Sequence, residues 1–537
     1  MRVQLLGTGA VLSLVAVTGV LQAPAAAGAG TRAGAELPLG APGLPETRTT
    51  TTLQPGVTLT RVVRGADAPA QPWTVEVAVP GGQSSPDPDA PPTALKDRAS
   101  ADELTDRLRQ EGFEARAERV DTPATADFGG GTLGWRVRVG TFTARADADA
   151  ERARLVAAGH TGSAVHTGWD GDARDRGPWR IDVLTVDPRL FRGSLEASYG
   201  PDLERREKTS ELAAARGASA AVNGGYFVLD SRSGAPGDPA GAGVYRGRTE
   251  SESVGGRPAL VTDAGGRGRV VRTAWSGEVV GRDTALELDG VNRVPGLIRN
   301  CGGTADDAPT ARPLHDVTCQ DPDELVAFTG AFGPRTPAGE GVEAVLDARG
   351  RVAEVRSPRG GVLPAGGSSV QATGALAERL AGLARVGERL RIAQALRDER
   401  GAELGTSPST SVVNGGPELV RDGRLHVTPA ADGMVHADNP SFYYGWAHKR
   451  NPRTLAGTDA AGRTVLVTAE GRDTDALGLS LVESATVARA LGLRDAVNLD
   501  GGGSTAMVAH GELLTDPSDT AGERPVGDAL LILPRRD

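Results

Sequence analysis

Alternating apolar and polar residues predict several strands in the first third of the chain. Residues 56–63 (GVTLTRVV), 73–79 (WTVEVAV) and 135–142 (WRVRVGTF) place apolar side chains at every second position, as in a strand with one buried face. Residues 95–112 and 147–159 instead repeat apolar residues at helical spacing. This part of the chain therefore predicts a mixture of strands and helices.

The same order of elements occurs twice within residues 71–170. Each half reads strand, helix, strand, and the last strands are expected at 113–120 and 162–168. Two βαβ units of this length predict a small ferredoxin-like (βαβ)2 sandwich. The second half, with VRVGTF before an Ala-rich helix, resembles a SPOR domain, a small fold that binds peptidoglycan glycan strands. A plain structural βαβ repeat is the alternative.

A second internal repeat lies in the larger remainder, residues 177–537. Residues 210–225 and 483–503 each join an Ala-rich helix that ends at a glycine, a short apolar strand, and an Asn followed by glycines. Residues 56–63 also resemble the first strand of this region, which leaves open whether 71–170 is inserted within it. The expected fold class is α+β, with a mixed-sheet larger domain containing a pseudo-repeat and a small ferredoxin-like domain.

The N-terminal residues predict export. Residues 1–27 combine one positive charge, an apolar run and small residues, as in a secretory signal peptide, and 28–55 predict a flexible leader. A retained membrane anchor is the alternative, but Gly, Thr and Ser shorten its apolar core. No later segment is long and apolar enough to span a bilayer. We expect a secreted protein, with no membrane span after signal cleavage and a possible association with the cell wall.

Charge and cysteine content narrow the function classes. The net charge is −10 and the sequence has no concentrated basic face, so we expect no nucleic-acid partner. Cys301 and Cys319 are the two cysteines, and an oxidising compartment would favour a disulfide between them. A zinc site is the weaker alternative, because no pair of histidines lies nearby at ligand spacing.

The chain runs from an apolar strand into Asn and glycines three times, at 221–227, 411–419 and 496–508. Glycines directly after a buried strand let ligand atoms approach the main chain, and consecutive N–H groups there can bind an anion. The third of these loops adds two hydroxyl groups and an Asp that could act as base or nucleophile. A tight structural turn is the alternative. The candidates from this loop are Asp500, Gly501, Gly502, Gly503, Ser504 and Thr505.

Two arginines near predicted strand ends add positive charge. Arg453 lies in the Pro-marked turn of NPRTLAG, and Arg472 follows the predicted strand 464–470. A guanidinium in such a position can bind phosphate in bidentate fashion. Glu470 and Asp473 flank Arg472 and are further candidate carboxylates. Loop position favours a functional role for these residues over a solvated surface role.

The order of these segments resembles the phosphodiester glycosidase family. NGGYF, NPRTLAG, EGRD with GLSLVE, AVNLDGGGSTAMV and ERPVGDALLI follow one another over roughly residues 180–537. The usual Asp-Gly-Arg of the family appears here as Glu470-Gly471-Arg472, which moves this carboxylate by one methylene. The resemblance implies hydrolysis of a sugar-1-phosphodiester at the anomeric carbon, which releases a sugar and a phosphomonoester. Because phosphate is a good leaving group, such a site mainly needs charge neutralisation and a base or nucleophile.

The resemblance also suggests roles for the candidates. Both arginines and the 501–505 loop would hold the phosphate, and Asp500 is the leading catalytic carboxylate, ahead of Glu470 and Asp473. Asparagines would orient sugar hydroxyls or lock the loops through bonds to the backbone. No cofactor or metal is implied, although Ca²⁺ on Asp473, Asp475 and Asp500 stays open. The further substrate-binding candidates are Asn223, Gly224, Gly225, Tyr226, Asn414 and Asn498.

We therefore expect a secreted hydrolase of sugar-1-phosphodiesters, held at cell-wall glycan by residues 71–170. The expected partners are a glycosyl phosphodiester and peptidoglycan glycan strands. Two alternatives stay open: a non-catalytic glycan-binding protein, and a phosphodiesterase that cuts the P–O bond. We expect deletion of residues 71–170 to remove wall binding and to spare hydrolysis.

Overall fold

The computed structural model describes residues 36–65, 71–79, 92–172, 174–300 and 314–535. The predicted signal peptide, residues 1–27, lies outside the described residues. In the part of the chain that is described, no helix has the length and apolarity needed to cross a bilayer. The mixture of strands, few helices and several sheets confirms the α+β fold class.

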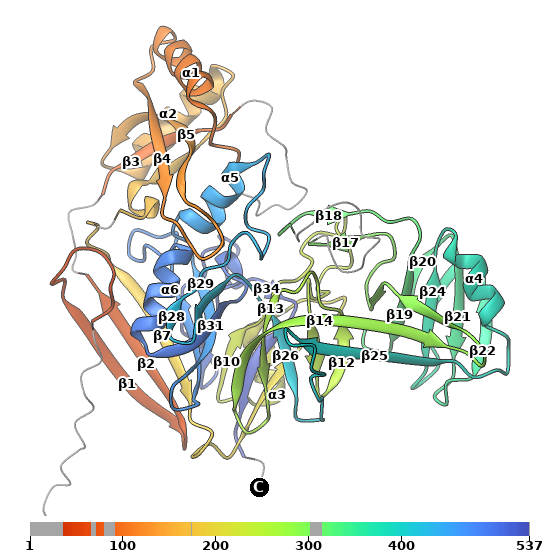
Figure 1. Cartoon of the computed structure of the whole chain (residues 1–537). Helices are drawn as coiled ribbons and strands as arrows, with labels where there is room; N and C mark the ends of the chain where they lie inside the picture. Colours follow the sequence, from red (N-terminus) through yellow and green to blue (C-terminus); the bar gives the residue numbers. More distant parts are fainter. Residues whose placement is uncertain (1–35, 66–70, 80–91, 173, 301–313, 536–537) are drawn as a thin grey trace, which may run out of the picture. The chain divides into compact units, whose positions relative to one another are not determined.

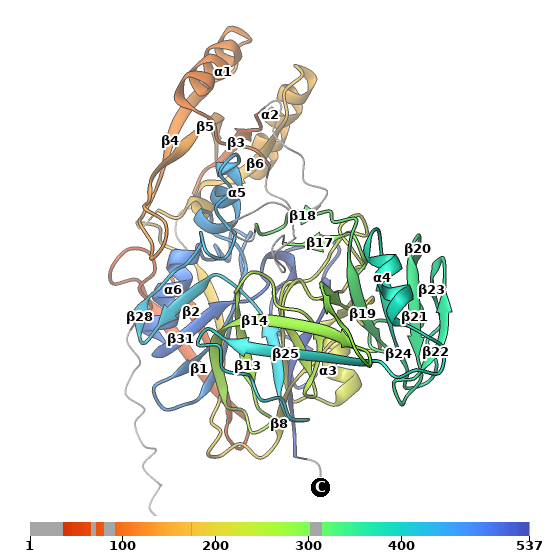
Figure 2. The same ribbon diagram turned by 45° about the vertical axis from the view of Figure 1, so that its right-hand side comes forward.

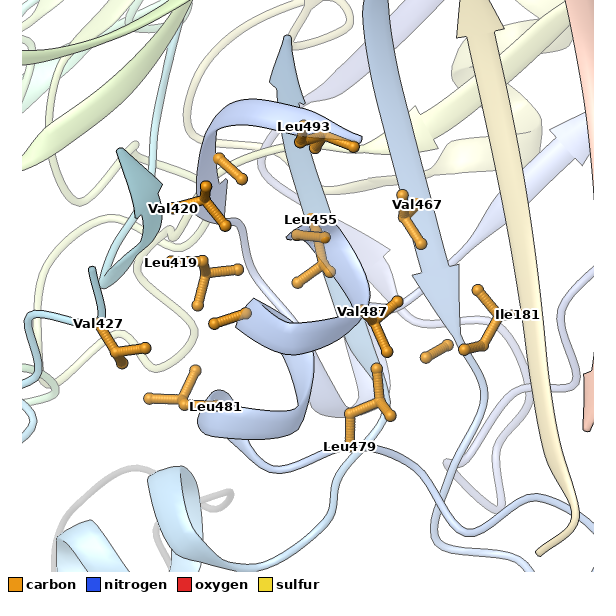
Figure 3. Close-up of a cluster of buried hydrophobic side chains, with 14 of the residues drawn as sticks. Ile181, Leu419, Val420, Val427, Leu455, Val467, Leu479, Leu481, Val487 and Leu493 are labelled. Atoms are coloured by element: carbon orange, nitrogen blue, oxygen red, sulfur yellow. The ribbon is translucent and has the colours of Figure 1, made fainter. Parts of the chain in front are cut away.

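An eight-stranded sheet forms the left-hand part of the larger domain in Figure 1. Helix α6 (Leu481–Ala490) packs on it and begins with the expected capping box between Ser480 and Glu483. Figure 3 shows the buried cluster in which Val487 of α6 lies against Leu455 and Val467 of the sheet. In order across the sheet, the strands are β1 (Glu46–Gln54), β2 (Val57–Arg64), β7 (Trp179–Val186), β30 (Thr464–Ala469), β29 (Arg453–Asp459), β31 (Leu493–Asn498), β27 (Glu418–Arg421) and β28 (Arg424–Leu425).

Two further sheets complete the core of the larger domain. One has five strands and carries α3 (Thr209–Arg216), which ends at Gly217 with a left-handed φ of 62°, as expected for a glycine cap. Its strands are β33 (Glu512–Leu513), β32 (Met507–Ala509), β10 (Ala220–Asn223), β35 (Ala529–Leu533) and β8 (Ser194–Ser198). The other contains β12 (Arg248–Ser251), β11 (Gly243–Tyr245), β26 (Ser411–Asn414), β13 (Pro258–Thr262), β14 (Gly268–Val280), β15 (Ala285–Leu288) and β25 (Arg391–Asp398).

A five-stranded sheet with its own apolar core lies beyond the long β14–β25 pair, as Figure 2 shows. Helix α4 (Leu376–Leu383) packs on this sheet through Leu380. Its strands are β16 (Gly290–Val291), β19 (Leu325–Thr329), β24 (Ser368–Ala372), β21 (Val342–Leu346) and β22 (Val352–Arg356). Short pairs join β17 (Ile298–Arg299) to β18 (Thr318–Cys319), β20 (Thr336–Gly339) to β23 (Arg359–Gly361), and β9 (Glu207–Lys208) to β34 (Pro525–Val526).

Residues 71–170, here called the module, form a separate four-stranded sheet with the ferredoxin-like order β4-β5-β3-β6. Helices α1 (Arg98–Gln110) and α2 (Arg145–Ala157) cover one face, where Val75, Val137 and Val139 are buried. The elements follow the predicted order, with the strand–helix–strand unit occurring twice. The strands are β3 (Trp73–Val77), β4 (Ala115–Thr122), β5 (Gly131–Phe142) and β6 (Gly162–His166), followed by the short turn η1 (Thr167–Asp170).

The opposite face of the module's sheet meets the larger domain. Glu76 and Arg138 alternate with the buried valines, so they point to this second face. There the Tyr444 hydroxyl donates to Glu76 at 2.7 Å and accepts from Arg136 at 2.8 Å. Tyr444 opens η2 (Tyr444–His448), a π-helical turn that continues α5 (Pro440–Tyr443), and Figure 1 shows α5 beside the module.

The chain leaves and re-enters the larger domain at neighbouring points. Strands β2 and β7 flank the module in sequence and pair antiparallel, with Arg64 opposite Trp179. The backbone pairing thus brings both ends of the module close together. The domain boundaries stay a prediction. The pairing of β2 with β7 is, however, what an inserted module would need, because it keeps the two ends of the insertion adjacent.

The predicted leader, residues 28–55, differs from the structure where it is described. Residues 46–54 form β1, which pairs with β2 along its length, and Leu37 and Leu39 are buried. The threonine-rich sequence TRTTTTLQ has a high strand propensity and finds an open sheet edge in β2. A composition rich in Ala, Gly, Pro and Thr therefore did not by itself indicate a flexible segment.

The predicted disulfide lies in part outside the described residues. Cys301 is not described, whereas Cys319 ends β18 and pairs with Ile298 of β17. This register brings Cys319 next to the stretch that leads into Cys301. The bridge stays a prediction.

Candidate active site

A cavity of about 60 Å³ is lined by two of the three Asn–Gly loops, and the third loop holds the cavity-lining Tyr226 through Asn414. The strands that lead into these loops are β10, β26 and β31. Seven of the sequence-predicted site residues line the cavity, namely Tyr226, Arg453, Asn498, Asp500, Gly501, Gly502 and Ser504. Distant parts of the chain thus converge on one hollow.

The three asparagines tie the loops to one another. Asn223 Nδ2 donates to the Asp500 carbonyl at 2.8 Å, and Asn414 Oδ1 accepts from the Tyr226 N–H at 2.9 Å. Asn498 Nδ2 donates to the Tyr226 hydroxyl at 2.7 Å. Asn223 and Asn414 do not line the cavity, so their bonds serve to fix the loops.

Close packing explains why several positions in these loops are glycine. A Cβ at Gly224 would lie 2.1 Å from the Asp528 carboxylate, and one at Gly225 would lie 2.7 Å from Asn414 Nδ2. Gly502 has a left-handed φ of 57°. Gly224 and Gly225 are therefore required by neighbouring side chains, and Gly502 by its backbone angle.

Arg453 is a buried cation beside this cavity. Its side chain is only 3% exposed, and its Nε donates to the Leu479 carbonyl at 3.0 Å while Nη2 donates to the Trp446 carbonyl. Burial, with a smaller contribution from the charge of Arg472, lowers the pKa of Arg453 to about 10. No carboxylate among the described residues forms an ion pair with it. A buried guanidinium held by carbonyls alone favours an anionic ligand.

Arg472 lies beside the cavity, next to Gly502, without being part of its lining. Its guanidinium stacks over the Trp446 ring at 5.7 Å, and its Nε donates to Asn451 Oδ1 at 3.2 Å. A Cβ built on Gly502 would lie 3.2 Å from Arg472 Nη2, so the side chain is next to the 501–505 loop. Two guanidinium groups and the glycine loop therefore share one region.

Asp500 supplies a carboxylate to the cavity. Its Oδ1 accepts from the Gly501 N–H at 2.9 Å, and the residue is half-buried. Burial raises the pKa of Tyr226, and the charge of Asp500 raises it further. Tyr226 therefore stays a neutral hydroxyl donor near this carboxylate.

Several buried polar atoms of the site have no partner among the described residues. They include Asn498 Oδ1, Ser504 Oγ and Trp446 Nε1, all of which belong to cavity-lining residues. Buried polar groups are normally hydrogen-bonded, so unpaired ones around a cavity indicate places for ligand hydroxyls or water.

Sequence reasoning missed part of the lining. Arg299, His315, Asp316, Trp446 and Arg524 also line the cavity. Arg299 pairs with Asp316 at 2.8 Å, and burial lowers the pKa of His315 well below its usual value, so this imidazole is neutral. Only Arg524 lies in a segment that carried a signal, ERPVGDALLI. The others lie in segments without a motif, Arg299 in β17 and Trp446 in η2.

Glu470 and Asp473 do not line the cavity. Glu470 follows β30, where its Oε1 accepts from the Asp516 N–H at 3.3 Å, and burial raises its pKa to about 7. Asp473 Oδ1 accepts from the Asp475 N–H at 2.9 Å and so closes a local turn. The other predicted site residues that are not among the lining are Arg472, Gly503, Thr505, Asn223, Gly224, Gly225 and Asn414.

No group of three or more His, Cys, Asp or Glu side chains in the described part of the chain could hold a metal ion. Asp473, Asp475 and Asp500 therefore do not form the calcium site that the sequence left open.

Comparisons with known proteins agree with both resemblances. The sequence profile of the phosphodiester glycosidase family matches residues 340–533, and that of the SPOR domain matches residues 93–166. The N-acetylglucosamine-1-phosphodiester alpha-N-acetylglucosaminidases of Mus musculus and Homo sapiens are 31% and 30% identical over 114 residues. This match covers 21% of this chain and 22% of each enzyme, so the chain spans about a fifth of the length of these curated relatives.

Solved structures extend the similarity over most of the chain. A candidate exported protein from Burkholderia pseudomallei K96243 is 33% identical with a TM-score of 0.82, over 93% of this chain and 98% of that one. A hypothetical protein from Synechocystis is 17% identical with a TM-score of 0.51, over 91% and 81% of the two chains, and shares the fold alone. The chain therefore carries a phosphodiester glycosidase domain at residues 340–533 and a SPOR domain at residues 93–166.

Proposed function

We propose that the chain is a hydrolase that cleaves a sugar-1-phosphodiester at its glycosidic bond and releases a sugar and a phosphomonoester. One observation carries the proposal: Arg453 is buried without a carboxylate partner among the described residues, in the same cavity as the carboxylate of Asp500. A cation and a carboxylate that do not neutralise each other suit a substrate with an anionic leaving group. The family supports this reaction class.

Residue roles follow from the geometry. Arg453, Arg472 and the main chain of Gly501 and Gly502 would hold the phosphate and stabilise the charge of the leaving phosphomonoester. Asp500 would take a proton from the attacking water while the water oxygen bonds to the anomeric carbon. At the same time, the bond between the anomeric carbon and the phosphate oxygen breaks. The proton then passes to the released phosphomonoester.

Hydrolysis in ¹⁸O-labelled water tests this assignment with an N-acetylglucosamine-1-phosphodiester. Label in the released sugar supports cleavage of the carbon–oxygen bond, whereas label in the phosphate supports the alternative phosphodiesterase. Absence of turnover with this and other glycosyl-1-phosphodiesters supports the non-catalytic glycan-binding protein. Asp500→Asn should abolish turnover while the protein stays folded, because the amide cannot accept the proton.

We also propose that the protein is exported and that the SPOR domain binds peptidoglycan glycan strands. The signal-like residues 1–27, the name of the Burkholderia relative and the SPOR match support this. The pairing of β2 with β7 supports an insertion of the module, residues 71–170, into the domain that resumes at 177. Binding of the full chain to purified cell-wall sacculi, and its loss after glycan digestion, would test the wall association.

A further inference from the structure

A second, larger cavity adjoins the candidate active site. It has a volume of about 500 Å³, against about 60 Å³ for the catalytic cavity, and lies between the module and the π-helical turn η2. Strand β6 contributes Ser163, η1 contributes Trp169, and η2 contributes Tyr444 and Trp446. We call this cavity the groove. The module thus forms one of its walls.

The groove and the catalytic cavity have a common wall. Trp446 lines both. Arg472 lines the groove, and it also lies beside Gly502, which lines the catalytic cavity. A phosphate held at Arg472 and Gly502 would therefore have one substituent in the small cavity and the other in the groove.

Most of the cationic side chains that line the groove form ion pairs within the protein. Lys449 pairs with Glu76 at 3.2 Å, Arg450 pairs with Glu483 and Asp175, and Arg145 pairs with Asp149 at 3.5 Å. A polyanion would need free cations, which these pairs do not supply. The groove instead requires an uncharged ligand along most of its length.

The remaining surface of the groove is aromatic and hydroxylic. It includes the rings of Trp169, Tyr444 and Trp446 and the hydroxyl of Ser518, whose buried Oγ has no partner among the described residues. Aromatic rings beside polar groups suit ligands with one apolar face and many hydroxyls. An oligosaccharide has this chemistry and, unlike a single sugar, the length to use the larger volume.

We propose that the groove binds a sugar chain that carries the phosphodiester, so that the SPOR domain forms part of the substrate-binding site as well as a wall anchor. The sugar to be released occupies the small cavity, the phosphate lies at Arg472 and Gly502, and the sugar chain on the far side of the phosphate lies against Trp446. Which part of the substrate lies in the small cavity and which in the groove follows from the proposed function, and in that respect this inference rests on it. The groove itself can be tested without catalysis.

Two substrates with the same scissile bond test the proposal. One is the methyl ester of N-acetylglucosamine-1-phosphate, and the other joins this phosphate to the 6-hydroxyl of an N-acetylglucosamine tetrasaccharide. The full chain should favour the tetrasaccharide ester by about tenfold in kcat/KM, because only this ester reaches the groove. Ser163→Trp fills the groove from an exposed position and should bring the ratio close to one. Ala157→Trp, exposed on the same module at the end of α2, is the matched control and should keep the ratio.

Binding of the free tetrasaccharide, followed by tryptophan fluorescence, separates this proposal from the proposed function. If neither ester is cut but Ser163→Trp weakens binding at least about fivefold relative to Ala157→Trp, the groove stands and the hydrolase proposal fails. If both esters are cut equally well and the two variants bind alike, the groove proposal is overturned and the hydrolase proposal stands. Binding of poly(glycerol phosphate) in place of the tetrasaccharide would also overturn it.

Discussion

At the scale of single residues, position in the sequence predicted which residue types take part in the chemistry better than it predicted where their side chains point. Arg453 and Asp500 were candidates because each lies at the end of a predicted strand, and both line the cavity. Glu470 lies at a similar place in sequence but not in the cavity. Side chains alternate along a strand, and Glu470 is in phase with Leu466 and not with Val467 and Ala469, so its direction depends on register. A motif gives the residue type but not the face.

Arg453→Ala should lower kcat/KM for a sugar-1-phosphodiester by about 10²–10³, the usual cost of one charge-stabilising donor. The melting temperature should change by only a few degrees, because the lost bonds to the Leu479 and Trp446 carbonyls are offset by relief of a buried charge. Arg463→Ala, an exposed arginine on the same hairpin, is the control and should keep full activity. Unchanged turnover in Arg453→Ala would refute its role at the phosphate.

Glu470→Gln should change how stability depends on pH. The folded pKa of about 7 lies above the ordinary 4.5, so the wild type has this stabilisation in full below pH 4.5 and loses it as pH rises through 7. The glutamine side chain does not titrate, so the stabilities measured at pH 5 and pH 8 should differ less in the variant, by about 2 kcal/mol. An identical pH dependence in both proteins would contradict a raised pKa.

At the scale of elements, the helix–strand–glycine unit could be predicted but its partners could not. Both copies, α3–β10 and α6–β31, form where the repeat indicates. Yet β10 and β31 lie in different sheets, and β26 supplies the third loop from yet another. Sheet membership depends on pairing between residues far apart in sequence, which local periodicity does not encode. The convergence of the loops therefore had to be inferred from their shared Asn–Gly pattern.

Gly224→Ala should damage this convergence. The added methyl group would lie 2.1 Å from the Asp528 carboxylate, which also accepts from the Gly225 N–H at 2.8 Å and the Tyr245 hydroxyl at 2.7 Å. We expect a loss of about 2–3 kcal/mol in the free energy of unfolding and a loss of activity. Chemical denaturation measures the first.

Gly382→Ala is the control for this substitution. Gly382 is exposed within α4, and a Cβ added there would have no atom within 4 Å. Alanine at this position should stabilise the protein by about 0.5–1 kcal/mol, because it favours the helix. Equal effects of both substitutions would show that the space around Gly224 is not restrictive.

At the scale of the whole chain, the repeat in residues 71–170 predicted the fold of the module but not its contacts. No pattern in the sequence indicates that Tyr444 pairs with Glu76 and Arg136, because these residues lie far apart in the chain. The Ser441 hydroxyl likewise accepts from the N–H groups of Ala94 and Leu95. The turn that forms a wall of the cavity is thus supported by the module.

Deletion of residues 71–170 should therefore impair hydrolysis as well as wall binding, which revises the expectation from sequence. The β2–β7 pairing keeps the cut ends adjacent, so the remaining chain can still close. However, Tyr444, Lys449 and the Trp446 carbonyl that holds Arg453 would lose their support. Turnover of the methyl ester and sacculi pull-down should both fall, whereas full turnover with pull-down lost would mean that the module is only a tether.

The buried ion network under the module has a thermodynamic consequence. Arg138 binds Glu76 at 2.9 Å and Asp170 at 2.6 Å, and Arg136 and Tyr444 join the same group. Undocking one part alone would bare these charges and leave the tyrosine hydroxyl without either partner. Scanning calorimetry should accordingly record a single endotherm for both parts of the chain. Proteolytic removal of the module should unfold the larger domain instead of releasing it intact.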